Sequence, residues 1–333
     1  MYIQEANHIG IHVPDSDDLG NIFLENKCFL VQEPDYTGII PSNILRRMGK
    51  AVRLGMGVAL PIIQKYPVDA IIMGTANGGL EDCIKFLNQI VEFEEGVLTP
   101  TNFVQSTPNA LAGQLAILTQ NHCYNNTHTN NALSFENALI DLKLQFEDHE
   151  NIQNAIVGAV DEISTYNFTI DCLTGIFIKK DQVAKNWVLE NYKGAIAGEG
   201  ATMFYLTKHS NNTSTIKIKA ISVGLLLDEH EISENVKELL LKHQLSVNDI
   251  QFISTGRNGD ERYQSIYDQV EALFPNAALN HFKSKCAEYK TATGFAVYEA
   301  FQTLQKQTKT SHYLIFNTLN QRQSLILIEK ESN

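Results

Sequence analysis

The chain has 333 residues, 44% of them hydrophobic and 19% charged, which is enough apolar material for about two domains' worth of core. Its 26 Lys and Arg against 38 Asp and Glu give a formal net charge of −12, which repels phosphate backbones and anionic headgroups and disfavours nucleic acid as a partner. No apolar run approaches the roughly 20 residues of a membrane span, so we expect no membrane insertion. No signal sequence is recognised and the five cysteines form no CxxC pair, so we expect a cytoplasmic chain with reduced thiols. We expect neither a metal nor a cofactor.

The first element that we single out is a helix over residues 46–60, RRMGKAVRLGMGVAL. Its basic residues Arg46, Arg47, Lys50 and Arg53 fall within about two helical turns. They could receive an acidic partner protein, form a solvated face, or pair with the chain's own excess acid.

Two segments of the chain repeat one pattern. Residues 69–91 and 249–271 each consist of an acidic start, an apolar strand, a Gly/Asn turn and an amphipathic helix, at an offset of 180 residues. An offset of more than half the chain favours one duplicated unit over a short-period solenoid, although generic strand-helix units also look alike. The glycines at residues 74–79 lack the pattern of a phosphate-binding turn, so we interpret them as close backbone packing after a strand.

Other apolar runs predict the remaining core. Residues 155–160, 219–227 and 312–317 are near-continuously apolar, which is typical of strands buried on both faces. Apolar residues at helical spacing predict helices over 235–243 and 296–307.

Three possible zinc ligands stand close together at His122, Cys123 and His128. Their spacing fits no zinc finger or ribbon, so a pair of loop histidines is favoured over a metal site. We interpret Cys123 as a buried, inert thiol.

Residues 99–118, TPTNFVQSTPNALAGQLAIL, resemble the segment that precedes the active-site cysteine in β-ketoacyl-acyl-carrier-protein synthases. Asn109 and the Ala112-Gly113 pair hold the family's places. The residues that keep the spacing around the nucleophile are Thr127, Ser134, Ala138 and Leu139, and the cysteine itself falls on Ala132. In the family a helix N-terminus lowers the pKa of this thiol. A methyl group can neither attack a thioester nor carry an acyl chain, so the resemblance implies a degenerate synthase.

The other catalytic motifs of the family are altered as well. Residues 253–260 resemble the first histidine motif and keep Gly256 and Asp260, but Thr255 stands near the histidine place. Residues 283–294 resemble the second motif, Lys-Ser-x-x-Gly-His-x-x-x-Ala-x-Gly, whose Gly-His pair is Ala287-Glu288 here. Residues 316–320 replace the Gly-Phe-Gly-Gly loop that completes the oxyanion hole.

The resemblance implies an α/β thiolase-like fold, with two duplicated βαβαβ halves whose mixed sheets stack around buried helices. We place the halves at residues 1–210 and 211–333, because the most polar stretch of the chain is 208–217. The segment over residues 116–129 would then lie at a dimer interface and bury Ile117, Leu118 and Tyr124 against a second subunit.

The degenerate pocket that we predict comprises Ala132, Ser134, Thr255, Lys283 and Glu288. Glu288 could be a functional base, or a structural carboxylate bonded to Lys283 or to backbone amides. We expect Ala132 to lie at the first turn of a buried helix, with Glu288 and residues 255–260 converging on it from the second half.

The altered motifs resemble those of chain-length factors, the non-catalytic subunits of polyketide and aryl-polyene synthases, although Ala132 stands where those factors commonly carry glutamine. The sequence therefore predicts a non-catalytic subunit of a heteromeric β-ketoacyl synthase in fatty-acid, polyketide or aryl-polyene pigment biosynthesis, inactive when alone. Its partners would be an active synthase or a second copy, and an acyl carrier protein at Arg46, Arg47, Lys50 and Arg53. One alternative is an acyl-thioester enzyme using Glu288 with Ser134, Thr255 or Cys123; another is a homodimeric acyl-binding or regulatory protein.

Overall fold

The computed structural model describes residues 1–11, 28–179, 184, 186–210, 215–225 and 231–332. Within these residues ten strands are hydrogen-bonded in the order β3-β2-β4-β5-β1-β6-β10-β9-β7-β8. Their bounds are β1 Tyr2–Gly10, β2 Ala70–Gly74, β3 Tyr124–His128, β4 Asn154–Asp161, β5 Gly200–Thr207, β6 Ile216–Leu225, β7 Phe252–Thr255, β8 Ala278–His281, β9 Ser311–Leu319 and β10 Arg322–Lys330.

The strand order is a duplication of one five-stranded pattern. In the first half β2 lies between β3 and β4, parallel to both, and β5 and β1 continue the sheet antiparallel. In the second half β7 lies in the same way between β8 and β9, followed by antiparallel β10 and β6. A single residue pair, Tyr2 with Lys217, joins the two half-sheets. The repeat at residues 69 and 249 therefore corresponds to β2 and β7, the equivalent central strands.

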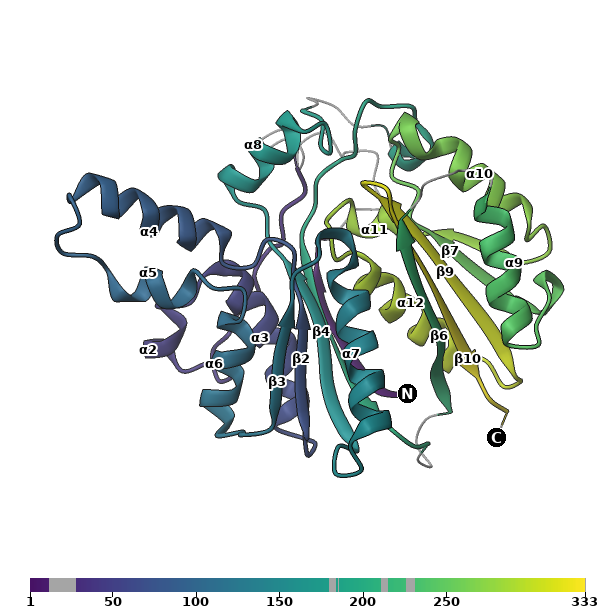
Figure 1. The fold of residues 1–333 in the computed structure, drawn as a ribbon, viewed down its shortest axis with the longest axis horizontal. Coiled ribbons are helices and arrows are strands. Elements are labelled where there is room, and N and C mark those ends of the chain that lie inside the picture. The colour runs from purple at the N-terminus through teal and green to yellow at the C-terminus, as the bar shows by residue number, and fades with distance from the viewer. Residues whose placement is uncertain (12–27, 180–183, 185, 211–214, 226–230, 333) are drawn as a thin grey trace.

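Helices form the other layers around the two half-sheets (Figure 1). α3 (Lys50–Ile63) and α6 (Ala110–Thr119) cover the outer face of the first half, and α9 (Ile232–Lys242) and α10 (Gln264–Ala272) cover that of the second. α7 (Ser134–Asp148) and α12 (Thr293–Gln305) contact strands of both halves. Successive strand residues face opposite sides of the sheet. Ile71 therefore packs into the hydrophobic cluster around α3 (the α3 core), whereas Ala70 and Ile72 pack into the cluster around α7 and α12 (the central core).

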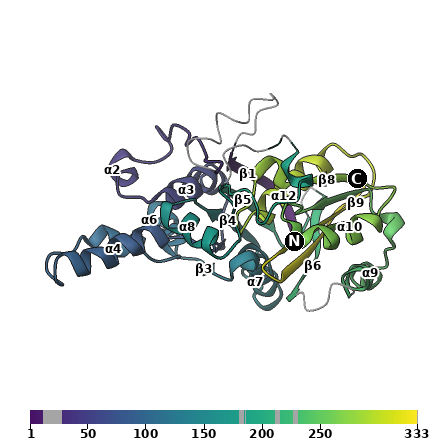
Figure 2. The same cartoon turned by 90° about the horizontal axis from the view of Figure 1, so that it is seen from above.

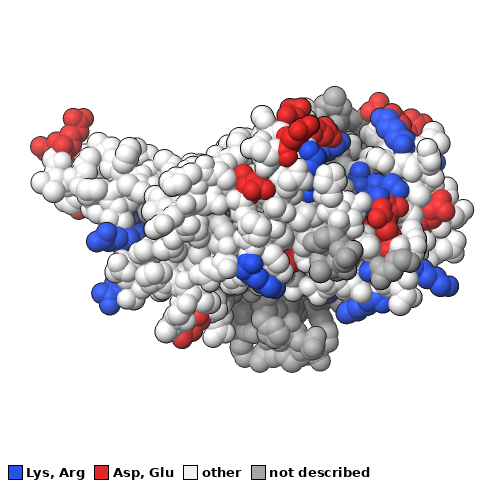
Figure 3. Space-filling view, turned by 90° about the horizontal axis from the view of Figure 1, so that it is seen from below, with Lys and Arg blue, Asp and Glu red and all other residues white. Residues whose placement is uncertain are grey.

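An arm projects from the first half. α4 (Leu80–Glu92) and α5 (Pro100–Gln105) lie beside each other and extend away from the sheets (Figures 1 and 2). α4 is amphipathic, yet none of its residues is buried. Acidic side chains gather at the far end of the arm (Figure 3), where the chain reads Glu92, Glu94 and Glu95.

The remaining helices are short. The α-helices are α2 Ser42–Leu45, α8 Thr165–Leu173 and α11 Lys283–Cys286, and the 3-10 turns span Asn131–Leu133, Trp187–Leu189, Val247–Asp249 and Glu261–Tyr263. None of the described helices is both long and apolar enough to cross a bilayer.

The predicted strands over residues 155–160 and 312–317 are confirmed, because β4 and β9 are buried along almost their whole length. The strand predicted over residues 219–227 is present as part of β6, but its predicted burial on both faces is wrong, because none of residues 219–225 is buried. Beyond Lys217 the strand β6 has β10 on one edge and no strand pairing on the other, and Leu225 is 60% exposed; residues 226 and 227 lie outside the described residues. The boundary that we placed after residue 210 falls between β5 and β6, next to residues 211–214, which also lie outside the described residues.

Candidate functional site

The nucleophile position lies where the chain enters the central helix α7. Ala132 is 2% exposed and sits in the 3-10 turn that runs directly into Ser134. The end of β2 approaches this turn closely: a Cβ atom at Gly74 would lie 2.6 Å from the carbonyl oxygen of Ser134. Glycine at position 74 thus permits the contact that places Ala132. The position offers the start of a buried helix, but the Ala132 side chain has no atom that could become a nucleophile.

A buried ion pair occupies the place of the second histidine motif. The Lys283 ammonium donates to Glu288 Oε2 at 2.6 Å, and the two side chains are 0% and 1% exposed. The amide of Asn258 donates to the same oxygen at 2.6 Å. Burial raises the pKa of Glu288, while Lys283 and Asn258 oppose that rise. The bond to Lys283 is the one expected of a structural carboxylate, and Oε1 has no hydrogen-bond partner among the described residues.

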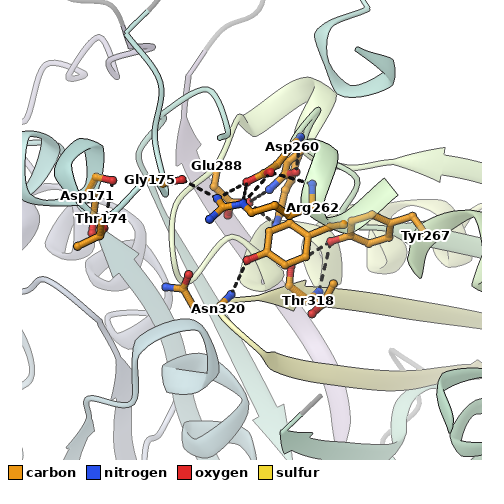
Figure 4. Close-up of polar contacts among 12 residues, drawn as sticks. Asp171, Thr174, Gly175, Asp260, Arg262, Tyr267, Glu288, Thr318 and Asn320 are labelled. Atoms are coloured by element: carbon orange, nitrogen blue, oxygen red, sulfur yellow. Dashed lines mark hydrogen bonds and ion pairs between the residues drawn. The ribbon is translucent and has the colours of Figure 1, made fainter. Parts of the chain in front are cut away.

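The loop that carries Asn258 is bonded to the first half of the molecule. Asp260 is buried and accepts from Arg262 Nε at 2.9 Å, and Arg262 Nη2 donates to the Gly175 carbonyl at 2.5 Å (Figure 4). The Tyr192 amide donates to the Gly259 carbonyl at 2.7 Å. The segment that resembles the first histidine motif is therefore hydrogen-bonded to two loops of the first half, at Gly175 and at Tyr192.

Ala287 stands at the glycine of the second motif in a conformation that suits glycine. Its φ of 56° and ψ of −162° lie in a region occupied almost exclusively by glycine. The residue is also buried, and a Cβ atom at Gly198 would lie 2.7 Å from the Ala287 methyl group. Ala287 thus has a backbone conformation that suits the glycine of the motif it resembles.

Glu136 lies in the first turn of α7 and is not among the site residues predicted from the sequence. Its side chain is buried, and Oε1 accepts from the Ser324 hydroxyl of β10 at 2.8 Å. Burial raises the pKa of Glu136, and the Thr293 hydroxyl and the Lys283 charge oppose that rise. The available signal was an acidic residue among the buried positions of a helix, four residues after Ala132.

Two predicted pocket residues point elsewhere. The Thr255 hydroxyl donates to Glu271 Oε1 at 2.7 Å, and the Ser134 hydroxyl donates to the Asn131 carbonyl at 2.8 Å. Both hydroxyls are therefore engaged in local structure. Glu136 connects α7 with the second half through Ser324, while Lys283 and Asn258 are bonded to Glu288.

The stretch over residues 316–320 is the end of a strand followed by a tight turn. β9 continues to Leu319, and Asn320 and Gln321, with φ of 51° and 59°, turn the chain into β10. Tyr267 donates to the Thr318 carbonyl at 3.1 Å, and the Asn320 amide donates to the Tyr263 hydroxyl at 3.0 Å (Figure 4). A regular hairpin thus replaces the oxyanion-hole loop.

The four basic residues near α3 divide into two kinds. Lys50 donates to the fully buried Glu199 at 2.5 Å, and Arg53 forms a bidentate pair with Glu33 at 2.5 and 2.7 Å. Arg46 and Arg47 are exposed and border a cavity of about 300 Å³. Lys50 and Arg53 thus pair with the chain's own acid, one of the alternatives for these four residues, and both still line the same cavity as Arg46 and Arg47.

Two of the three possible zinc ligands, His128 and Cys123, have separate partners. His128 Nε2 lies 2.7 Å from Asp141 of α7, and Cys123 Sγ lies 3.5 Å from the Tyr124 carbonyl oxygen. Burial raises the pKa of Cys123 to about 11, although the residue is only partly buried. Across the residues with described positions no three histidine, cysteine or acidic side chains are grouped to hold a metal ion.

This architecture is the thiolase-like fold of the ketosynthases, which the sequence predicted. Residues 27–170 match the family model described as Beta-ketoacyl synthase, N-terminal domain, which confirms the resemblance in that part of the chain. No curated protein matches the chain by sequence.

Several solved structures share the fold across the whole chain. The ishigamide ketosynthase/chain length factor is 13% identical, with 100% of this chain and 99% of that chain covered and a TM-score of 0.78. The ketosynthase ApeO in complex with its chain length factor ApeC, from Xenorhabdus doucetiae, is 14% identical, with 99% and 97% covered and a TM-score of 0.73. A β-ketoacyl synthase from Burkholderia phymatum is 11% identical, with 100% and 99% covered and a TM-score of 0.75.

Proposed function

We propose that the chain is a non-catalytic, chain-length-factor-type subunit that supports an active condensing partner in fatty-acid, polyketide or aryl-polyene biosynthesis. The observation that carries this proposal is the methyl group of Ala132 at the start of α7. The catalytic role of that position needs a thiolate, whereas burial raises the pKa of the two buried thiols, Cys28 and Cys286.

The bonding of the remaining polar groups supports the same proposal. A condensing site needs donors that meet the charge developing on a malonyl thioester as it loses carbon dioxide. Here the Lys283 ammonium and the Asn258 amide already donate to Glu288. A carboxylate at this place opposes an enolate.

The rewired-enzyme alternative finds less support. It requires Glu288 to act on a hydroxyl or thiol, but the Ser134 and Thr255 hydroxyls donate to Asn131 and Glu271. Cys123 packs against the α3 core on the outer face of the first half-sheet, whereas α7 covers the inner face.

The exposed apolar surface of the first half supports a partner subunit. On the arm Leu87 is 52% and Val91 80% exposed, and on α6 Ile117 is 73% exposed. α6 packs against β3, the edge strand of the sheet, which has one side unpaired by the described strands. Exposed large apolar side chains and an open strand edge are both typical of an interface. Of the residues expected there, Leu118 and Tyr124 are partly buried.

The partner is therefore proposed as a second thiolase-fold chain, an active synthase in the cell and a second copy when the chain is expressed alone. Arg46 and Arg47, which make no ion pair with described residues, remain the proposed contact for an acidic acyl carrier protein.

Co-expression of the tagged chain with a ketosynthase encoded beside it tests the proposal. We expect the two chains to co-purify and all condensation of acyl and malonyl thioesters to require the partner's cysteine. Intact-mass analysis should detect an acyl adduct on the partner only. A stable adduct or condensation with this chain alone would establish the rewired enzyme. Homodimers that never capture a synthase, with product output unchanged on deletion, would favour an acyl-binding or regulatory protein.

A further inference from the structure

A second cleft lies at the opposite end of α7 from Ala132. It has a volume of about 390 Å³ and runs between the last turns of α7 and the strand β6. At a rise of 1.5 Å per residue, Phe146 lies about 20 Å along the helix from Ala132. The side of the molecule at which α7 ends is the one drawn in Figure 3. The cleft is therefore separate from the condensing-enzyme remnant.

The parting of the two half-sheets creates this cleft. β1 and β6 share only the pair Tyr2 with Lys217. Two residues further along β6, the pairing with β10 contains a bulge: Ile218 faces Ile328 and Ala220 faces Leu327, so Lys219 is the extra residue.

The bulge sets the lining of the cleft. In an unbroken strand Ile218 and Ile221 would point to opposite faces. The extra residue shifts the alternation, so that both isoleucines pack toward the central core, while Ala220 packs toward the α9 side. A strand irregularity thereby gives the cleft an apolar floor.

The floor is apolar, and the rim carries three lysines against one acidic residue, Glu147. Phe146, Ile218 and Ile221 line the inner part, and Lys143, Lys208 and Lys219 line the same cleft. Several apolar side chains with a few polar groups at one end are typical of a small-molecule site, and the volume lies within the usual range.

Two of the lysines lack a close counter-ion. Lys219 pairs with Glu329 at 2.9 Å, but Lys143 lies 3.9 Å from Glu147, a distance at which the attraction between exposed groups is weak. Lys208 forms no ion pair with any described residue. Their positive field extends beyond the cleft, because Lys219 and Lys143 add to the burial that lowers the pKa of His243 at the end of α9. This local positive excess occurs in a chain of net charge −12.

We propose that this cleft binds a small amphipathic carboxylate. The carboxylate lies between Lys143 and Lys208, and the alkyl body lies on Phe146, Ile218 and Ile221. Binding supplies the counter-charge that the two lysines lack and removes the apolar floor from water. The proposal is independent of the proposed subunit function, since the cleft shares no residue with the remnant site or with the arm.

Calorimetric titration of the whole chain with octanoate, octanamide and acetate tests the proposal. Octanoate should bind more tightly than octanamide, which has the same chain without the charge, and more tightly than acetate, which has the charge without the chain. Raising the salt concentration from about 0.05 M to about 0.5 M should weaken octanoate binding and leave octanamide binding unchanged. Equal affinities for octanoate and octanamide, or no binding of either, would overturn the proposal without any substitution.

Variants locate the site. Lys143→Ala combined with Lys208→Ala should weaken octanoate binding about fivefold and leave octanamide unaffected, whereas Ile221→Asn should weaken both. Lys242→Ala is the matched control, because Lys242 is an exposed helical lysine with a glutamate four residues before it, like Lys143. Octanoate binding that survives both cleft variants, or that Lys242→Ala weakens equally, would place the ligand elsewhere and reject the cleft.

Discussion

Glu288 accepts a 2.6 Å hydrogen bond from Lys283 in a region where neither side chain reaches solvent. The two residues stand five positions apart, at the places predicted for the lysine and the histidine of one motif, and here they are partners of each other. A buried pair of this kind adds little stability relative to apolar residues, but breaking it leaves a charge uncompensated. The stability of the remnant site thus depends on both members of the Lys283–Glu288 pair being present.

Lys283→Met should destabilise the chain by about 3–5 kcal/mol, because it leaves Glu288 buried without its counter-charge. Lys285→Met is the matched control: Lys285 is 52% exposed and pairs with Glu299, so its loss should cost less than about 1 kcal/mol. Combining Lys283→Met with Glu288→Leu should recover most of the loss. Urea denaturation measures all three variants, and similar stabilities for the two lysine variants would contradict the dependence.

The stability should fall as the pH rises through neutrality, in part because of Glu162. Burial raises the pKa of Glu162 to about 7, while its Oε2 accepts from the Ala51 amide at 2.9 Å. A folded pKa above the unfolded value of 4.5 means that its contribution is fully present below about pH 4.5 and is lost as the pH rises through about 7.

Glu162→Gln removes this dependence. Relative to the variant, the native chain should lose about 3 kcal/mol of unfolding free energy between about pH 5 and pH 8. Glu238→Gln serves as the control, because exposed Glu238 has a lowered pKa and is ionised throughout that range. Denaturation at several pH values decides the matter; parallel curves for the native chain and Glu162→Gln would contradict the assignment.

Ala287→Gly should leave stability nearly unchanged. Relief of the glycine-type backbone conformation, about 1–3 kcal/mol, offsets the lost methyl burial and the greater flexibility of unfolded glycine, each roughly 1 kcal/mol. Ala296→Gly, at an equally buried position inside α12, should cost about 1–2 kcal/mol because no strain is relieved there. Thermal unfolding of both variants compares them, and equal losses would show that Ala287 is unstrained.

The ordered motifs and the internal repeat could predict the fold, because both depend on local order along the chain. The repeat at residues 69 and 249 identified β2 and β7, and the spacing to Ser134 placed Ala132 at the start of α7. Side-chain partners distant in sequence could not be predicted in this way. Glu136 is bonded to Ser324, 188 residues away, and Thr255 is turned away by Glu271 on the neighbouring α10.

Ala132→Cys should not restore condensation. The thiol would stand in a buried turn one helical turn before the carboxyl group of Glu136, and both burial and a nearby carboxylate raise a thiol's pKa. No histidine is present in either motif to stabilise the developing enolate. Incubation with acyl and malonyl thioesters followed by mass analysis of protein and products measures the outcome. Substantial condensation by the single variant would mean that the histidine places have been assigned wrongly.

Leu87→Glu combined with Val91→Glu should weaken subunit association at least about tenfold while leaving the fold intact. Both side chains are exposed in α4, which has no buried residue, so the monomer loses little packing, whereas an apolar interface would have to bury two charges. Leu241→Glu is the matched control, since Leu241 is 74% exposed near the end of α9 on the outer face of the second half. Light scattering after size-exclusion chromatography, for the chain alone and with the co-expressed synthase, gives the association states. If the α4 variant associates as well as Leu241→Glu does, the arm lies outside the interface and the partner contacts must be sought along β3.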